Sequence, residues 1–112
     1  MKLSALFIAA IPLASAWHLQ LYENELYNGI LEDRSGTWGQ PCKNLPPSAR
    51  NKVSSMKWNG DGFGPIECEI VLYNWDGCRE AGGILGRSEG NWNVPSFSSQ
   101  ANDKVESYKI NC

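Results

Sequence analysis

The feature that most constrains this chain of 112 residues is a strand-like octapeptide that occurs twice. Residues 51–58 read Asn-Lys-Val-Ser-Ser-Met-Lys-Trp, and residues 103–110 read Asp-Lys-Val-Glu-Ser-Tyr-Lys-Ile. Lys, Val, Ser and the second Lys match in register, and apolar residues fall at the same two places in each copy. Such self-similarity indicates an internal duplication, so the chain is expected to contain two related units.

Two further landmarks repeat in the same order at offsets of about fifty residues. Residues 19–24 (Leu-Gln-Leu-Tyr-Glu-Asn) correspond to residues 70–75 (Ile-Val-Leu-Tyr-Asn-Trp). The triplet Asn44-Leu45-Pro46 precedes the first octapeptide much as Asn93-Val94-Pro95 precedes the second. A chance origin for three matches in order is improbable, and the whole chain after its first residues is therefore expected to be duplicated.

Residues 1–16 have the pattern of a secretory signal peptide. Lys2 supplies a positive charge, residues 3–13 are mostly apolar, and Ala14-Ser15-Ala16 is a small-residue cleavage site. The apolar run is shorter than the about 20 residues of a membrane span. We therefore expect a secreted, extracellular protein with no membrane partner and a single domain at residues 17–112.

Within that domain, a stretch rich in glycine and proline at residues 59–66 does not suit a regular element and is predicted to be a linker. The two units are then about residues 17–58 and about residues 67–112. Alternating apolar residues at 17–21 and 54–58 are typical of half-buried strands, and residues 68–73 are rich in strand formers. Residues 82–90 are interpreted as turns because of their glycines. No sustained helical period is present, which predicts an all-β fold.

Charge and cysteine content narrow the classes of function. The formal net charge is −2, and the charges are scattered without a basic run, which disfavours a nucleic-acid partner. An even number of cysteines in a short secreted chain indicates two disulfides, and three pairings are open. A zinc site would need closely spaced Cys and His pairs, which are lacking. The cysteines are Cys42, Cys68, Cys78 and Cys112.

The first unit contains Tyr22, Tyr27 and Gly29, spaced Tyr-x4-Tyr-x-Gly, and Ser55 in its closing strand. This pattern resembles the Greek-key signature of the βγ-crystallin family. In this signature the first aromatic packs over a folded hairpin, the glycine lets the hairpin bend back, and the serine hydroxyl ties it down. The resemblance implies an all-β fold of two Greek-key motifs packed as a βγ-crystallin-like sandwich.

The second unit departs from the signature. It keeps Tyr73 and Ser107, but Cys78 stands where the second aromatic is expected and Glu80 where the glycine is expected. In a longer hairpin, Gly82 or Gly83 would take the glycine's role.

The Greek key also implies a disulfide pairing, because its last strand lies beside its first. Antiparallel neighbours would bring Cys68 close to Cys112, which leaves Cys42 to join Cys78 across the two units.

Many microbial βγ-crystallins bind calcium through the pattern (N/D)-(N/D)-x-x-(S/T)-S, and Ca²⁺ takes hard oxygen ligands. Residues 50–55 match it except that Arg50 holds the first position, and residues 102–107 match except that Glu106 replaces Ser or Thr. Arg50 would repel a nearby cation. Alternatively, these residues only terminate turns and brace the hairpins. The resemblance implies one calcium site from Glu23, Asp103, the Lys104 carbonyl and Glu106, and another from Asn74, Asn51, the Lys52 carbonyl and Ser54.

No catalytic set emerges from the sequence, which has a single histidine, His18, and we expect no enzyme. Trp17 and Trp58 are expected in the core, whereas three tryptophans in polar, turn-rich stretches could stack on sugars. The preferred interpretation is a secreted, non-enzymatic binding or structural module stabilised by calcium. The alternative is an interaction protein without calcium dependence, glycan-binding, effector-like or toxin-like, whose partner is an extracellular glycan or protein. The three tryptophans are Trp38, Trp75 and Trp92.

Overall fold

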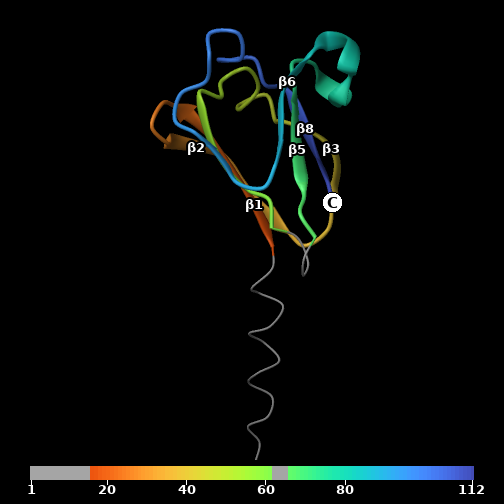
Figure 1. Ribbon diagram of the computed structural model, residues 1–112. Coiled ribbons are helices and arrows are strands. Elements are labelled where there is room, and N and C mark those ends of the chain that lie inside the picture. The colour runs from red at the N-terminus through yellow and green to blue at the C-terminus, as the bar shows by residue number, and fades with distance from the viewer. Residues whose placement is uncertain (1–15, 62–65) are drawn as a thin grey trace, which may run out of the picture.

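The computed structural model describes residues 16–61 and 66–112, which form two antiparallel four-stranded sheets (Figure 1). The expected signal peptide lies outside the described residues except for Ala16, and part of the expected linker does as well. No helix in the described part of the chain is long and apolar enough to cross a membrane. The all-β prediction is confirmed.

Eight strands and two short 3₁₀ turns are present in the described residues. The strands are β1 (Trp17–Asn24), β2 (Asn28–Gly36), β3 (Gln40–Asn44), β4 (Ser55–Asn59), β5 (Glu69–Tyr73), β6 (Ile84–Glu89), β7 (Trp92–Val94) and β8 (Ser107–Asn111). The turns are η1 (Asp76–Cys78) and η2 (Glu80–Gly82).

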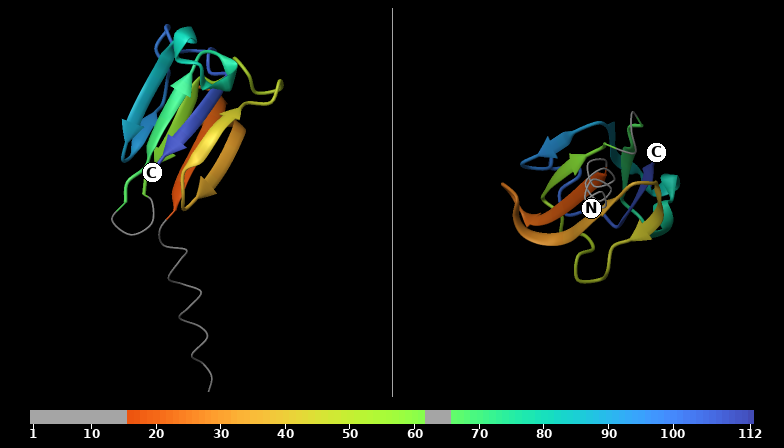
Figure 2. Two further views of the ribbon diagram at one scale, coloured as in Figure 1. Left: turned by 90° about the vertical axis from the view of Figure 1, so that its right-hand side faces the viewer. Right: turned by 90° about the horizontal axis from the view of Figure 1, so that it is seen from below.

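The two units exchange one strand each. The first sheet has the order β2-β1-β4-β7 and the second the order β3-β8-β5-β6. Three strands of each unit are neighbours, while β3 of the first unit and β7 of the second lie in the opposite sheet. Figure 2 shows the resulting pair of layers, with the 3₁₀ turns at one end. This is the pair of interlocked Greek keys that the resemblance implied.

The first hairpin is shaped by a β-bulge. Strand β1 buries alternate residues from Trp17 onward, as its apolar alternation predicts. The pairing of β1 with β2 shifts between Leu21 and Tyr22, so that both of these consecutive side chains are buried. The pairing of β5 with β6 shifts at the corresponding place, between Leu72 and Tyr73. The bulge therefore occurs at the same position in both units.

The interpretation of residues 82–90 as turns is wrong, because strand β6 fills most of this stretch. Its glycines serve two other purposes. Gly83 has φ +107° and directly precedes the return strand β6, and it corresponds to Gly29, which has φ +77° near the start of β2. A Cβ on Gly86 would lie 2.7 Å from Cη2 of Trp92, so this glycine permits a close approach between two elements. The hairpin of the second unit is longer than that of the first. Gly83 therefore takes the role of the signature's glycine, which the spacing of the first unit would place at Glu80.

Main-chain hydrogen bonds confirm the duplication. The Ser54 N–H donates to the Tyr22 carbonyl over 2.8 Å, and the Glu106 N–H donates to the Tyr73 carbonyl over 2.9 Å. The octapeptides and the segments 19–24 and 70–75 are therefore equivalent in space as well as in sequence.

The match of Leu45 with Val94 is wrong. The Leu45 N–H donates to the Glu106 carbonyl and the Phe97 N–H donates to the Ser54 carbonyl, each over 2.9 Å. Because Glu106 and Ser54 are equivalent, Leu45 corresponds to Phe97, three residues beyond Val94. A shared Asn-x-Pro triplet does not fix the register of a loop.

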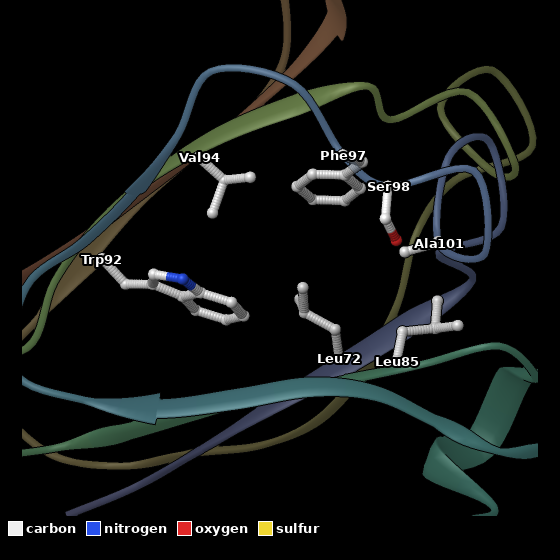
Figure 3. A pocket seen from close by; sticks show the side chains of 7 residues that line it. All are labelled: Leu72, Leu85, Trp92, Val94, Phe97, Ser98 and Ala101. Carbon is white, nitrogen blue, oxygen red and sulfur yellow. The ribbon is translucent and has the colours of Figure 1, made fainter.

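The core lies between the sheets. Trp17 and Trp58 pack with ring centroids 5.9 Å apart and are buried, as expected. Trp38 and Trp75 are exposed, and Trp92 is half-buried at a pocket between the sheets (Figure 3). Other fully buried large side chains are Leu19, Leu21, Leu45, Val53, Met56, Ile70, Val71, Leu72, Tyr73, Val105, Tyr108 and Ile110.

Both disulfides follow the pairing that the Greek key implied. Cys68 and Cys112 join the start of β5 to the end of β8, across a sequence separation of 44 residues. Cys42 in β3 joins Cys78 in the second unit's hairpin, across 36 residues. The second bridge fastens the exchanged strand of one unit to the other unit.

Candidate metal site

Oxygen-bearing groups from both units meet in a surface pocket of about 330 Å³ beside the first octapeptide. Ser54 is buried there, and its hydroxyl donates to the Asp103 carboxylate over 3.3 Å. Carboxylate, amide, hydroxyl and main-chain carbonyl oxygens are the ligands of Ca²⁺, which takes about six to eight of them. The chemistry of this donor set therefore fits calcium. The remaining lining residues are Glu23, Asn24, Asn51 and Lys52, all of them exposed.

A main-chain crossing between the octapeptides builds this pocket. The Asp103 N–H donates to the Val53 carbonyl, and the Asn51 N–H donates to the Val105 carbonyl, both over 3.0 Å. Asn51 and Asp103 each have φ +61°, a left-handed conformation in which Asn and Asp are enriched. The first residue of each octapeptide is thereby held against the opposite unit.

The structure divides the expected calcium ligands differently from the sequence-based assignment. Glu23 and Asp103 line one pocket as expected, but their companions come from the first octapeptide instead of the second. The crossing is the reason, since it holds Asp103, the first residue of the second octapeptide, against the ligands of the first unit. Asn24, which the assignment omitted, also lines the pocket and directly follows Glu23. The companions are Asn51, Lys52 and Ser54.

Asn74, Lys104 and Glu106 do not line this pocket. By its main-chain hydrogen bond to Tyr73, Glu106 holds the position in the second unit that Ser54 holds in the first. The equivalent set in the second unit therefore combines Asn74, Asp103, the Lys104 carbonyl and Glu106 with Asn51 from the crossing.

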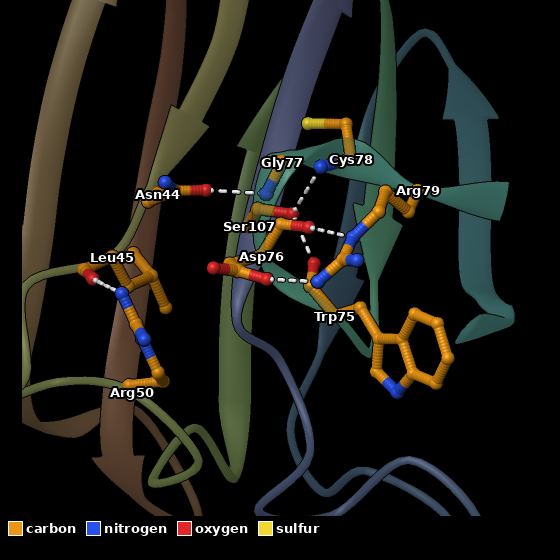
Figure 4. Close-up of polar contacts among 9 residues, drawn as sticks. All are labelled: Asn44, Leu45, Arg50, Trp75, Asp76, Gly77, Cys78, Arg79 and Ser107. Carbon is orange, nitrogen blue, oxygen red and sulfur yellow. Dashed lines mark hydrogen bonds and ion pairs between the residues drawn. The ribbon is translucent and has the colours of Figure 1, made fainter. Parts of the chain in front are cut away.

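Two arginines adjoin residues of this second set: Arg50 directly precedes Asn51, and Arg79 contacts Trp75, the residue after Asn74 (Figure 4 shows both arginines). The Arg79 guanidinium pairs with the Asp76 carboxylate at 2.7 Å and stacks over the Trp75 ring, 5.0 Å from its centroid. Arg50 donates through Nη2 to the Leu45 carbonyl over 3.2 Å. The hydrogen bond from Arg79 is the main cause that lowers the pKa of Asp76 below 3.8, and the Arg50 charge lowers it further. Positive charge next to this set disfavours a bound cation.

The serine of the Greek-key signature ties the first hairpin down. The Ser55 hydroxyl donates to the Asn24 carbonyl over 2.6 Å and accepts the Tyr27 N–H over 3.1 Å. The Tyr22 and Tyr27 rings meet edge to face, with centroids 5.7 Å apart. This hairpin positions Glu23 and Asn24 at the pocket.

Ser107 makes the same pair of bonds in the second unit. Its hydroxyl donates to the Trp75 carbonyl over 2.5 Å and accepts the Cys78 N–H over 2.9 Å. Asn44 accepts the neighbouring Gly77 N–H over 2.6 Å (Figure 4). Cys78 thus stands at the place of Tyr27, as the sequence indicated, and uses it for the bridge to Cys42.

In residues 16–61 and 66–112, no group of three or more His, Cys, Asp or Glu side chains is placed to hold a metal ion. The pocket beside Ser54 contains two carboxylates, and its other oxygens are neutral. His18 bonds through Nε2 to the Asp33 carboxylate at 2.6 Å on the exposed side of β1. This contact gives the single histidine a hydrogen-bonding partner, so no metal is needed to explain its position.

No protein-family model matches the chain, and no curated protein sequence matches it significantly. Solved structures are similar in fold. A βγ-crystallin domain from Clostridium beijerinckii is 20% identical with a TM-score of 0.57, over 84% of this chain and 97% of that one. A βγ-crystallin from an archaeon is 18% identical with a TM-score of 0.57, over 83% and 95%. One from Flavobacterium johnsoniae is 20% identical with a TM-score of 0.52, over 82% and 91%. The chain has the fold of microbial βγ-crystallin domains.

Proposed function

We propose that this protein is a secreted, non-enzymatic binding module that takes one calcium ion in the pocket beside Ser54 and is stabilised by it. The observation that carries the proposal is the convergence of oxygen ligands from both units, with Ser54 Oγ 3.3 Å from the Asp103 carboxylate. An ion held between the units would oppose their separation. Secretion is supported by the two disulfides, which persist in oxidising compartments.

The donor set favours calcium over transition metals. Only oxygens are offered, and zinc or copper sites are built mainly from His and Cys. With Glu23 and Asp103 as the only carboxylates lining the pocket, the charge count is low, which places the dissociation constant with extracellular calcium modules, at about 10⁻⁴–10⁻³ M. A solved relative in fold, a serine-to-histidine double mutant of clostrillin, is in complex with nickel and has a TM-score of 0.57 to this chain.

One ion per chain is expected, because the second set lies next to Arg50 and Arg79. Introducing a divalent cation there would oppose two positive charges that already interact with Asp76. The two units thus keep the same backbone and differ in ligand chemistry.

The test is a thermal unfolding series in excess calcium and in chelator, with calorimetric titration for stoichiometry. A ligand that binds only the folded state at a hundredfold excess over its dissociation constant adds about 2.7 kcal/mol of stability. Asp103→Asn and Ser54→Ala should remove most of the calcium-dependent rise in Tm. Glu106→Gln is the matched control in the other unit and should keep it.

Two outcomes would overturn the calcium proposal. One is an unchanged Tm of the original protein at millimolar calcium. The other is loss of the calcium effect in Glu106→Gln while Asp103→Asn retains it, because the ion would then lie in the second unit.

Glycan binding is the second candidate function, and one observation favours it. A polar pocket of about 180 Å³ is lined by four side-chain amides, and amides are suited to sugar hydroxyls. Retention on an immobilised polysaccharide in chelator, lost in Asn93→Leu, would put this function ahead of calcium binding. The amides belong to Gln20, Asn59, Asn91 and Asn93.

A further inference from the structure

The sandwich has two openings between its sheets, and the duplication makes them comparable position by position. At one opening β2 lies opposite β3, and at the other β7 lies opposite β6. Two residues correspond when they hold the same register position in equivalent strand pairs. The register of the two sheets therefore shows which residue at one opening corresponds to which residue at the other.

The opening between β2 and β3 is closed by three polar residues. The Tyr108 hydroxyl donates to the Glu32 carboxylate over 2.7 Å, and the Lys43 ammonium lies 3.3 Å from the same carboxylate. Tyr108 is fully buried, and the Glu32 side chain is 10% exposed. A phenol ring from the second sheet therefore fills this opening and is fastened to an edge strand of the first.

At the equivalent positions of the other opening these groups are missing. Tyr108 pairs with Lys43 in the register of β8 and β3, as Met56 pairs with Val94 in β4 and β7. The position of Glu32 corresponds to Gly86, since Glu32 pairs with Leu21 and Gly86 with the equivalent Leu72. Phenol, carboxylate and ammonium are thus replaced by Met56, Gly86 and Val94.

The second opening consequently contains a pocket of about 230 Å³, here called the β6–β7 pocket (Figure 3). The Trp92 ring covers part of it by lying directly over Gly86. The described side chains around it offer only two polar groups, the Ser98 hydroxyl and the Trp92 indole N–H, and none that titrates. The apolar wall is formed mainly by Leu72, Leu85, Val94 and Phe97.

We propose that the β6–β7 pocket binds a small uncharged ligand consisting of one aromatic ring with a small substituent. The equivalent opening shows the size and shape that fit, since a phenol ring fills it. An apolar cavity of about 150 Å³ takes benzene, so the larger β6–β7 pocket has room for one substituted ring. Charged ligands are rejected because no counter-ion lines the pocket and an unpaired buried charge is costly. The Ser98 hydroxyl offers a hydrogen bond to a ring substituent.

The test is a titration of the protein with p-cresol, which reproduces a tyrosine side chain, followed by NMR. Chelator is present throughout, so that the result is independent of the calcium proposal. Saturable shifts confined to Trp92, Leu72, Phe97 and their neighbours are expected. Benzoate, which is of similar size but charged, should bind at least about tenfold more weakly than p-cresol.

Variants locate the ligand. Ala101→Leu extends a pocket-lining side chain into the space and should weaken p-cresol binding about tenfold. Ser98→Ala should weaken p-cresol about fivefold and leave toluene unchanged, since toluene lacks the hydroxyl. Ser99→Ala, a neighbouring exposed serine, is the matched control and should change neither.

The proposal is overturned if p-cresol gives no saturable shifts at Trp92, or if benzoate binds as tightly. Binding that is unchanged in a folded Ala101→Leu protein would overturn it as well. Should that variant not fold, intermolecular nuclear Overhauser contacts from p-cresol to Leu72 and Phe97 in the original protein decide the matter. Their presence supports the site, and their absence despite binding places the ligand elsewhere.

Discussion

A buried hydroxyl that donates one hydrogen bond and accepts another leaves two main-chain groups without partners when it is removed. Ser55 and Ser107 are such residues, each fully buried and each placed between a carbonyl and an N–H of its own hairpin. Their equivalence explains why a serine is kept in both octapeptides while the residue before it differs.

We predict that Ser55→Ala lowers the free energy of unfolding by about 1–3 kcal/mol, the cost of leaving buried polar groups unsatisfied. Ser107→Ala should lower it by a similar amount. Ser96→Ala removes a hydroxyl that bonds Glu25 on the surface, and it should stay within about 0.5 kcal/mol. Urea unfolding measures all three, and a surface-like value for Ser55→Ala would contradict the role given to the hydroxyl.

Tyr108 predicts a loss of stability in alkali. Burial, followed by its hydrogen bond to the negatively charged Glu32, raises the pKa of this phenol above the ordinary value of 10.0. The folded protein then keeps the proton while the unfolded chain loses it. Stability from this group is therefore complete below pH 10.0 and is lost as the pH rises further.

Chemical unfolding at pH 8 to about 11 measures this loss, and Tyr108→Phe is expected to flatten the alkaline fall in stability. Tyr22→Phe serves as a comparison, because burial raises the pKa of Tyr22 too, but without a carboxylate hydrogen bond among its causes. An alkaline fall that is unchanged in Tyr108→Phe would show that other groups cause it.

At the scale of elements, the glycines around β6 act through different physical causes. Gly83 has φ +107° and nothing within 4 Å of an added Cβ, so a substitution there strains only the backbone. An added Cβ at Gly86 would meet the Trp92 ring at 2.7 Å, so a substitution there acts through contact.

We predict that Gly83→Ala lowers stability by about 1–3 kcal/mol, the cost of a sparsely populated backbone conformation, without changing the tryptophan emission spectrum. Gly86→Ala should shift that emission, because the Trp92 ring must move away. Unfolding curves and fluorescence spectra of the two variants make the comparison. An emission change in Gly83→Ala alone would contradict the assignment of causes.

These glycines also show which part of the fold the sequence does not predict. The alternation at residues 17–21 and the duplicated octapeptide predicted strands correctly, because a half-buried strand has a period of two. Strand β6 was missed since glycine is an ordinary signal of turns, and its use for a close approach to Trp92 depends on a residue from another element. A contact of that kind leaves no local pattern.

At the scale of the whole molecule, the calcium ligands illustrate the same limit. The sequence identified Glu23, Asn51, Ser54 and Asp103 as ligand-type residues, and all four line one pocket. Their grouping depends on the crossing of the two octapeptides, which spacing along one chain does not encode. The disulfides could be anticipated because Greek-key topology places Cys68 beside Cys112, which leaves Cys42 for Cys78.

The two bridges should contribute comparably to the stability of the whole domain. Their loops of 36 and 44 residues differ little in closure entropy, and each corresponds to about 4 kcal/mol in the chain-entropy account. We predict a greater loss for the Cys68→Ala, Cys112→Ala pair than for the Cys42→Ala, Cys78→Ala pair, because Cys68 is fully buried and its replacement also leaves a cavity. Denaturant midpoints of the two double variants provide the test.

The exchange of β3 and β7 has a consequence for how such a molecule can diversify. Two identical units that trade strands make a symmetric dimer, in which every substitution appears twice and both openings must stay alike. Joining the units in one chain replaces association at micromolar concentration by an encounter at effective millimolar concentration and releases the two halves from that constraint. Here the opening between β2 and β3 is closed by polar side chains, while the equivalent opening contains the β6–β7 pocket and can take a ligand.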